Sequence, residues 1–214
     1  AMAHVSDRRL PHFVRARTSG QAPAERCSHT ATLVGGRFLI IIGGGYTEPG
    51  GGPFRHFDCV HRLDTRTLRW DMPVATGPRF PARRGHTACL HGPTGRIVVF
   101  GGDSDSGLRD DVWMLDVSGT GPIQWAERAV AGSRPRPRRG HGAAILPTAG
   151  GEVMLVFGGF LEHIAQPSHV TPDETDGDSG SSFIHALRFT PQLRWERVTA
   201  KGDRPHALAL SAYC

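Results

Sequence analysis

One spacing recurs four times along this chain and constrains its fold more than any single motif. In each case a glycine follows an aromatic residue at a distance of seven positions. The four pairs are Phe13 and Gly20, Trp70 and Gly77, Trp125 and Gly132, and Trp195 and Gly202. Because self-similar segments in a constant order are typical of folds built from stacked equivalent units, we expect a repeat protein.

The segments after each glycine also repeat. A proline leads to an arginine and a histidine in "PAERCSH" (23–29), "PARRGH" (81–86) and "PRRGH" (137–141); the fourth copy, "RPHALALSA" (204–212), keeps the proline but has lost the arginine and the histidine from their places. A short apolar segment follows, then a β-branched run that ends in glycines, then a third apolar run. The second and third runs are "RFLIIIGGG" (37–45) and "CVHRLD" (59–64), "RIVVFGG" (96–102) and "DVWMLD" (111–116), and "EVMLVFGG" (152–159) and "FIHALRF" (183–189). Such short runs predict strands rather than helices, four to a unit of about 55 residues.

These motifs resemble Kelch repeats. The diglycines of the family are matched by Gly43 and Gly44, Gly101 and Gly102, and Gly158 and Gly159, and its fourth-strand tryptophan by Trp70, Trp125 and Trp195. The usual third-strand tyrosine is replaced by Arg62, Met114 or Leu187. The resemblance implies an all-β fold, a Kelch-type β-propeller of stacked four-stranded blades.

The repeats extend over the whole chain, so we expect one Kelch β-propeller domain at 1–214. Its complete blades are predicted at about 23–75, 81–130 and 137–199, with partial strands at about 8–17 and 205–213. Three blades would leave open faces at both ends. We therefore expect the chain to be part of a ring of about six or seven blades, with self-association through open blade edges as the alternative.

Charge and composition exclude several classes of protein. The formal charge of +5 invites a nucleic-acid role, but Lys201 is the only lysine and the arginines are spread along the chain, so nucleic acid is not the expected partner. No apolar run is long enough to span a membrane, and no secretory leader is visible. Four cysteines stand far apart, which favours reduced thiols in the cytoplasm or the nucleus.

Repetition divides the arginines into two groups. In an up-and-down blade the loops that join strand 2 to strand 3 and strand 4 to the next strand 1 emerge on one face, and the 2–3 loops at 46–57, 103–110 and 160–182 show no strand pattern. Arg26, Arg83 and Arg138 stand three residues before each histidine, so we assign them a structural role. The other arginines of the 4–1 segments are candidates to bind a partner, with solvated loop charge as the alternative: Arg79, Arg84, Arg134, Arg136 and Arg139.

These observations predict a non-catalytic protein–protein interaction module. We expect a substrate receptor or adaptor that recognises a protein or peptide, acidic or carboxylate-bearing, on the 2–3/4–1 face. No catalytic residue, cofactor or metal is predicted: His29, His86 and His141 belong to different blades and are expected to form hydrogen bonds where each first strand begins, and the acidic stretch in 160–182 has no known ligand spacing. The alternative is a Kelch-like propeller enzyme of the oxidase, epimerase or lyase type.

Overall fold

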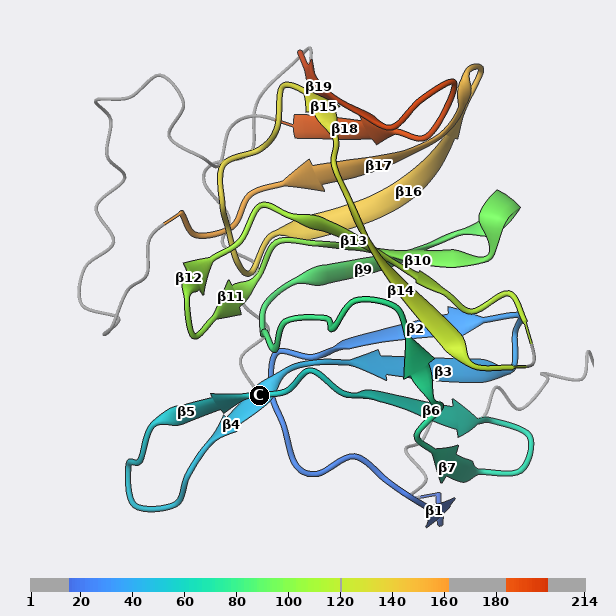
Figure 1. The fold of residues 1–214 in the computed structure, drawn as a ribbon, viewed down its shortest axis with the longest axis vertical. Helices are drawn as coiled ribbons and strands as arrows, with labels where there is room; N and C mark the ends of the chain where they lie inside the picture. The colour runs from blue at the N-terminus through green and yellow to red at the C-terminus, as the bar shows by residue number, and fades with distance from the viewer. Residues whose placement is uncertain (1–15, 120, 162–183, 200–214) are drawn as a thin grey trace, which may run out of the picture.

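The chain folds almost entirely into β-strands. The computed structural model describes residues 16–119, 121–161 and 184–199, and Figure 1 shows their arrangement. Within those ranges the helical content is one 3-10 turn, Gly92–Thr94, and no α-helix. The predicted all-β fold is confirmed, whereas the partial strands near 8–17 and 205–213 lie outside the described residues, apart from 16 and 17.

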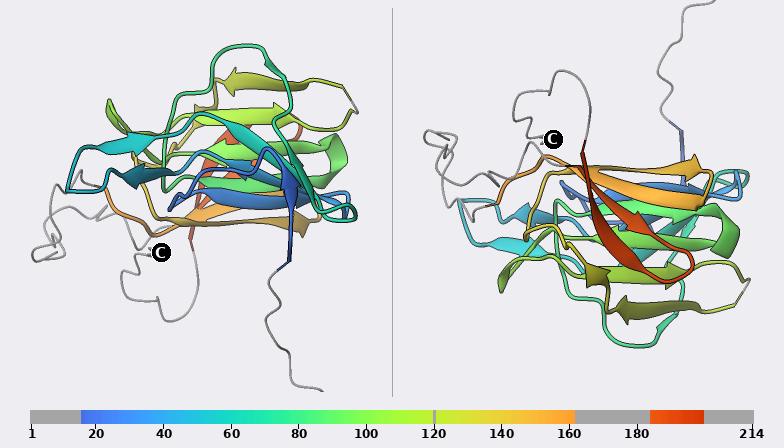
Figure 2. Two further views of the ribbon diagram at one scale, coloured as in Figure 1. Left: turned by 90° about the horizontal axis from the view of Figure 1, so that it is seen from below. Right: turned by 90° about the horizontal axis from the view of Figure 1, so that it is seen from above.

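Three sheets contain an antiparallel meander of four strands each. Blade 1 consists of β2 (Thr30–Val34), β3 (Phe38–Ile42), β6 (Val60–Asp64) and β7 (Arg69–Asp71). Blade 2 consists of β9 (Thr87–His91), β10 (Arg96–Phe100), β13 (Val112–Asp116) and β14 (Ile123–Arg128). Blade 3 consists of β16 (Gly142–Thr148), β17 (Gly151–Phe157), β18 (Ile184–Arg188) and β19 (Arg194–Val198). Blade 2 lies between the other two, and Figure 2 shows the sheets stacked face to face.

Each sheet has a fifth strand that the sequence did not predict. These strands are β1 (Ser19–Gly20), β8 (Ala75–Thr76) and β15 (Ala131–Gly132), and they pair in parallel with β7, β14 and β19. The recurrent glycine lies here, against the tryptophan of the following blade: a Cβ on Gly77 would stand 2.2 Å from the carbonyl oxygen of Trp125. A two-residue strand buries no hydrophobic pattern of its own, which is why sequence periodicity does not reveal it.

Two of the 2–3 loops contain short hairpins, so the expectation that they lack strands is wrong. In blade 1, β4 (Gly45–Thr47) pairs with β5 (Phe54–His56), and in blade 2, β11 (Asp103–Ser104) pairs with β12 (Gly107–Leu108). The corresponding loop at 160–182 falls outside the described residues beyond 161. Glycines and charged residues interrupt these hairpins and hide the alternation that identifies longer strands.

Strand register corrects one equivalence between blades. Arg62 pairs with Ile40, and Met114 pairs with Val98. Both second-strand partners, Ile40 and Val98, stand three residues before the first glycine of the diglycine. In blade 3 that register belongs to Leu155, whose partner is Ala186. The residue in place of the third-strand tyrosine is therefore Ala186 rather than Leu187.

The core consists of the two junctions between blades. Alternate residues of β10 face opposite ways: Ile97 and Val99 pack toward blade 1, and Val98 and Phe100 toward blade 3. The fourth-strand tryptophans follow the same rule. Trp125 (3% exposed) and Trp195 (1% exposed) are each buried against the preceding blade, and the Trp125 ring stacks on Phe80 at 4.1 Å between ring centroids.

Blade 1 shows what the junction contributes. Trp70 occupies the equivalent place, but no blade precedes it among the described residues, and it remains half-buried. Its neighbour on the same open side, Leu33, is 53% exposed. Burial of these large side chains thus depends on an adjacent blade rather than on the blade's own sheet.

The contrast between these tryptophans gives a prediction. Trp125→Ala should lower the free energy of unfolding by about 3–5 kcal/mol, because it removes a fully packed aromatic from a junction. Trp70→Ala should cost less than half as much, since part of that ring already contacts water. Urea denaturation of both variants makes the comparison; equal losses would contradict the assignment of Trp125 to a blade junction.

Candidate functional site

The segments that lead into the first strands meet the 2–3 loops on one face of the molecule. Each contact is a single antiparallel bridge to the residue after a diglycine. The bridges join Cys27 to Gly45, Arg84 to Asp103 and Arg139 to Phe160. The two kinds of loop thus form one continuous surface, called here the 2–3/4–1 face.

The repeated arginines lie directly beneath this face. Nη1 of Arg26, Arg83 and Arg138 donates to the carbonyl of the first glycine of each diglycine, at 3.0, 3.0 and 2.8 Å. Arg83 and Arg138 are buried. Their Nε atoms donate to carbonyls two residues earlier in the chain, at 3.2 and 3.1 Å, which holds the segment in a tight turn.

The partner of this arginine differs between blades 1 and 2. Asp111 accepts two hydrogen bonds from Arg83, at 2.6 and 2.8 Å. Burial alone would raise the pKa of Asp111, but the hydrogen bonds and positive charges of its neighbours, those of Arg83 first, together outweigh burial and hold that pKa below its usual value. In blade 1 the equivalent residue is Cys59, whose Sγ accepts from Arg26 Nη1 at 3.3 Å.

The diglycines connect neighbouring blades. The second glycine donates its amide to the carbonyl of the next blade's arginine, from Gly44 to Arg83 at 2.9 Å and from Gly102 to Arg138 at 2.8 Å. The first glycine faces the next blade's histidine: a Cβ on Gly43 would lie 2.9 Å from the ring of that residue. A side chain at either position would separate the blades.

The repeated histidines also bridge the blades. His86 Nε2 lies 3.1 Å from Thr30 Oγ1, and His141 Nε2 lies 2.9 Å from Thr87 Oγ1, so each imidazole contacts the first strand of the preceding blade. Burial, assisted by the adjacent arginine, lowers the pKa of both histidines to about 3 and keeps them neutral. Across the described ranges, no three His, Cys, Asp or Glu side chains gather as a metal site would require.

Three of the five arginines proposed to bind a partner are already paired with carboxylates of the 2–3 loops. Arg79 binds Asp58 at 2.7 Å, and Arg134 binds Asp110 at 3.2 Å. These two arginines stand two residues after the recurrent glycine, so they are equivalent positions of the repeat. The grouping of arginines by their distance from the histidine did not reveal this equivalence. Their ion pairs tie the 4–1 segments to the 2–3 loops.

Arg84 and Arg139 are also equivalent, one residue after the buried arginine. Arg84 binds the buried Asp103 at 3.2 Å and lies over the ring of Phe54, 3.8 Å from its centroid. Arg139 is half-buried over Phe160, at 5.6 Å, and its Nε is a buried donor without a hydrogen-bond partner. Arg136 is exposed, and its side chain makes no hydrogen bond or ion pair within the described part of the chain.

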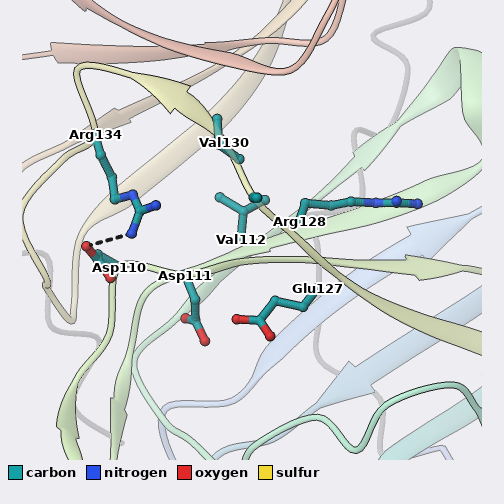
Figure 3. Close-up of a pocket in the computed structure, with 8 residues that line it drawn as sticks. Asp110, Asp111, Val112, Glu127, Arg128, Val130 and Arg134 are labelled. Carbon is teal, nitrogen blue, oxygen red and sulfur yellow. Dashed lines mark hydrogen bonds and ion pairs between the residues drawn. The ribbon is translucent and has the colours of Figure 1, made fainter.

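A hollow of about 350 Å³ lies at the outer margin of the same face. Figure 3 shows the Arg134–Asp110 ion pair at one side of it, with Val112 and Val130 between that pair and Arg128. Asp111 and Glu127 complete the acidic lining. The hollow therefore adjoins the segment that carries Arg136 and Arg139.

The whole repeat region of this chain matches a known protein family. The KLHDC2/KLHL20/DRC7 Kelch-repeats domain matches residues 4–214. The chain belongs to the Kelch-repeat family. Kelch-repeat domains are commonly protein-interaction modules.

Curated Kelch relatives are much longer than this chain. Host cell factor 1 from Homo sapiens is 27% identical over 204 residues, covering 89% of this chain and 10% of the relative. Host cell factor 2 from Homo sapiens is 27% identical over 206 residues, covering 89% and 25%. Acyl-CoA-binding domain-containing protein 4 from Arabidopsis thaliana is 30% identical over 163 residues, covering 73% and 23%. The chain thus spans at most a quarter of the length of these relatives.

Among the described residues, no helix has the length and apolar character needed to cross a bilayer.

The buried Kelch arginine should matter for stability. Arg83→Ala should lower the free energy of unfolding by about 3 kcal/mol, because it leaves the Asp111 carboxylate without its two-pronged partner. Arg66→Ala, an exposed arginine on the opposite face, should change stability by less than about 0.5 kcal/mol. Chemical denaturation measures both. Equal stability of the two variants would contradict a structural role for Arg83.

The junction histidines predict a pH dependence. Their pKa of about 3 in the folded chain lies below the ordinary 6.5, so the unfolded chain binds more protons between these values. Stability is therefore full above pH 6.5 and falls as the pH drops toward 3, by up to about 1.4 kcal/mol per pH unit for each histidine. His86→Gln should make this slope shallower in denaturation curves from pH 7 to 4. An unchanged slope would show that His86 titrates normally.

Proposed function

We propose that this chain is a non-catalytic protein-interaction module that recognises a protein or peptide on its 2–3/4–1 face. Membership of the Kelch family and the gathering of side chains from adjoining blades on that face support the proposal. The role within a cell would be that of a substrate receptor or adaptor, which brings a bound protein to another component.

The observation that carries the proposal is the contrast between paired and unpaired arginines. The guanidinium groups of Arg79, Arg84 and Arg134 form ion pairs with carboxylates of the face itself. Arg136 and Arg139 have no such carboxylate in the described ranges, although they lie on the same segment. A planar guanidinium binds a carboxylate through two parallel hydrogen bonds. We therefore propose that the partner offers an acidic side chain or a terminal carboxylate to these two arginines.

The cysteines bear on the compartment of this module. Cys27, Cys59 and Cys89 are free thiols. Burial raises the pKa of Cys89 to about 11, which keeps that thiol protonated and unreactive. Free thiols favour a reducing compartment, and we propose the cytoplasm or the nucleus.

A peptide selection tests the proposed binding face. A phage library that displays random peptides with free carboxyl ends is selected on the chain at low salt. Selected peptides are then synthesised with free and with amidated carboxyl ends, and the affinities of the two forms are compared. We expect enriched peptides with Asp, Glu or a terminal carboxylate, and affinities that fall at least tenfold in the double variant Arg136→Ala with Arg139→Ala. Affinity should also decrease as added salt shortens the Debye length to about 8 Å at physiological ionic strength.

A matched control removes the same charge from the opposite face. The double variant Arg66→Ala with Arg194→Ala alters two exposed arginines, one in the turn between the third and fourth strands of blade 1 and one at the start of β19, and it should bind the selected peptides normally. Arg84 is left intact in both, since it pairs with the buried Asp103. Equal affinity of both double variants for the peptides would overturn the proposed face.

A further inference from the structure

The hairpin of blade 2 on the 2–3/4–1 face ends in a turn that offers a serine hydroxyl to solvent. Asp105 and Ser106 join β11 to β12, and both residues are exposed. Nη1 of Arg109 donates to Ser106 Oγ at 3.2 Å, and Ser104 Oγ lies 3.1 Å from the same atom. The Asp105 carboxylate lies 2.8 Å from Nδ1 of His56 instead. The hairpin, which projects from its sheet in Figure 1, thus places an accessible hydroxyl beside a guanidinium.

Arg109 makes the longest of the contacts to the carboxylate that it shares. Its Nη2 donates to Asp111 Oδ2 at 3.3 Å. That oxygen already accepts from Nη2 of Arg83 at 2.8 Å and from Nε1 of Trp113 at 2.9 Å. Because Arg83 also donates to Oδ1, at 2.6 Å, Arg109 can turn to a second anion without leaving Asp111 unpaired. The guanidinium beside Ser106 is therefore available to a new negative charge.

The repeated scaffold does not account for this serine and its arginine. In blade 1 the equivalent hairpin is closed by residues 48–53, "EPGGGP", which have no side-chain hydroxyl. The place of Arg109 is taken there by Phe57, because each residue accepts the amide of the next blade's buried arginine through its carbonyl. Ser106 and Arg109 occur together in blade 2, and blade 1 has neither. A role of this pair in recognition or regulation therefore explains it better than a structural role common to all blades.

Backbone hydrogen bonds join this hairpin to the segment that carries the arginines proposed to bind a partner. The amide of Arg138 donates to the carbonyl of Arg109 at 3.1 Å, and the amide of Gly102 donates to the carbonyl of Arg138 at 2.8 Å. Arg138 stands between Arg136 and Arg139 in the sequence. A charge added to the hairpin therefore acts next to the segment whose two guanidinium groups are proposed to meet the partner.

We infer that Ser106 is a phosphorylation site that weakens partner binding at the 2–3/4–1 face, an inference that rests on the proposed function. In this step Ser106 Oγ attacks the γ-phosphorus of ATP bound to a protein kinase, the bond to the leaving ADP breaks, and the hydroxyl proton is released. The product carries about two negative charges and three strong acceptor oxygens at neutral pH. Arg109 donates to these oxygens and holds the phosphate at the face, where its charge repels the acidic group of an arriving peptide.

Two measurements test the site without any binding partner. The chain is purified from its source cells in the presence of phosphatase inhibitors, and mass spectrometry should find phosphate on Ser106. Phosphoserine is then installed at position 106 of the full chain through an expanded genetic code, and its phosphorus NMR signal is followed against pH. An unperturbed phosphoserine takes up its second proton at about pH 6. The phosphate on Ser106 should take it up at lower pH, and Arg109→Ala should restore the ordinary value.

Peptide affinity tests the effect of the phosphate on the binding face. Peptides selected on the unmodified chain should bind at least about tenfold more weakly to the chain phosphorylated at Ser106, because like charges then meet at the face. Ser106→Ala should bind them normally. The matched control carries phosphoserine at Ser19, an exposed residue of β1, which lies apart from the hairpins in Figures 1 and 2. This control should bind the peptides as tightly as the unmodified chain.

Each failure has a separate meaning. Absence of phosphate from Ser106, or a titration that Arg109→Ala leaves unchanged, would overturn the site. Equal peptide affinity of the chains modified at Ser106 and at Ser19 would overturn the regulation and leave the proposed function intact. A selection that yields no acidic peptide would contradict the proposed function instead, and the two measurements made without a partner would still test the site.

Discussion

The structure depends on a guanidinium beneath each pair of loops, which is fully buried in blades 2 and 3. Arg83 donates to the carbonyl of Gly101 and to Asp111, and Arg138 donates to the carbonyl of Gly158. A buried arginine is unfavourable unless such groups satisfy it, so the first strand, the diglycine and the third strand must meet at one point. The loops of the 2–3/4–1 face are held in place by this contact.

The same contact explains why glycine is required beside it. Gly102 has a φ of 100°, and a Cβ there would lie 2.8 Å from the carbonyl of Arg84. The chain must therefore pass close to the next segment in a conformation that side chains disfavour. This close approach also brings Arg84 and Arg139 to the surface directly after the buried arginine. The buried arginine that supports the fold and the arginine on the proposed binding face are thus adjacent residues of one segment.

The arginines show how far sequence reasoning reaches. Repetition separated Arg83 and Arg138 from their neighbours, and their burial gives the physical reason. Repetition did not identify the ion pairs of Arg79 and Arg134, because the partner aspartates lie 21 and 24 residues away in the chain and only the fold brings them together. The parallel strands β1, β8 and β15 also escaped notice, since two residues paired through backbone atoms leave no side-chain pattern.

The sequence by itself determined the repeat, the strand content and the recurrence of the diglycines, because these follow from the order and the local hydrophobic pattern of the residues. Only the tertiary structure decided which charges are free. Arg134 and Arg136 look alike in the sequence and are both exposed, but Asp110, 24 residues away from Arg134, pairs with Arg134, whereas Arg136 has no carboxylate partner among the described residues. The tertiary structure also decided that His86 and His141 meet threonine hydroxyls of the preceding blade, since such contacts arise only where two blades face each other.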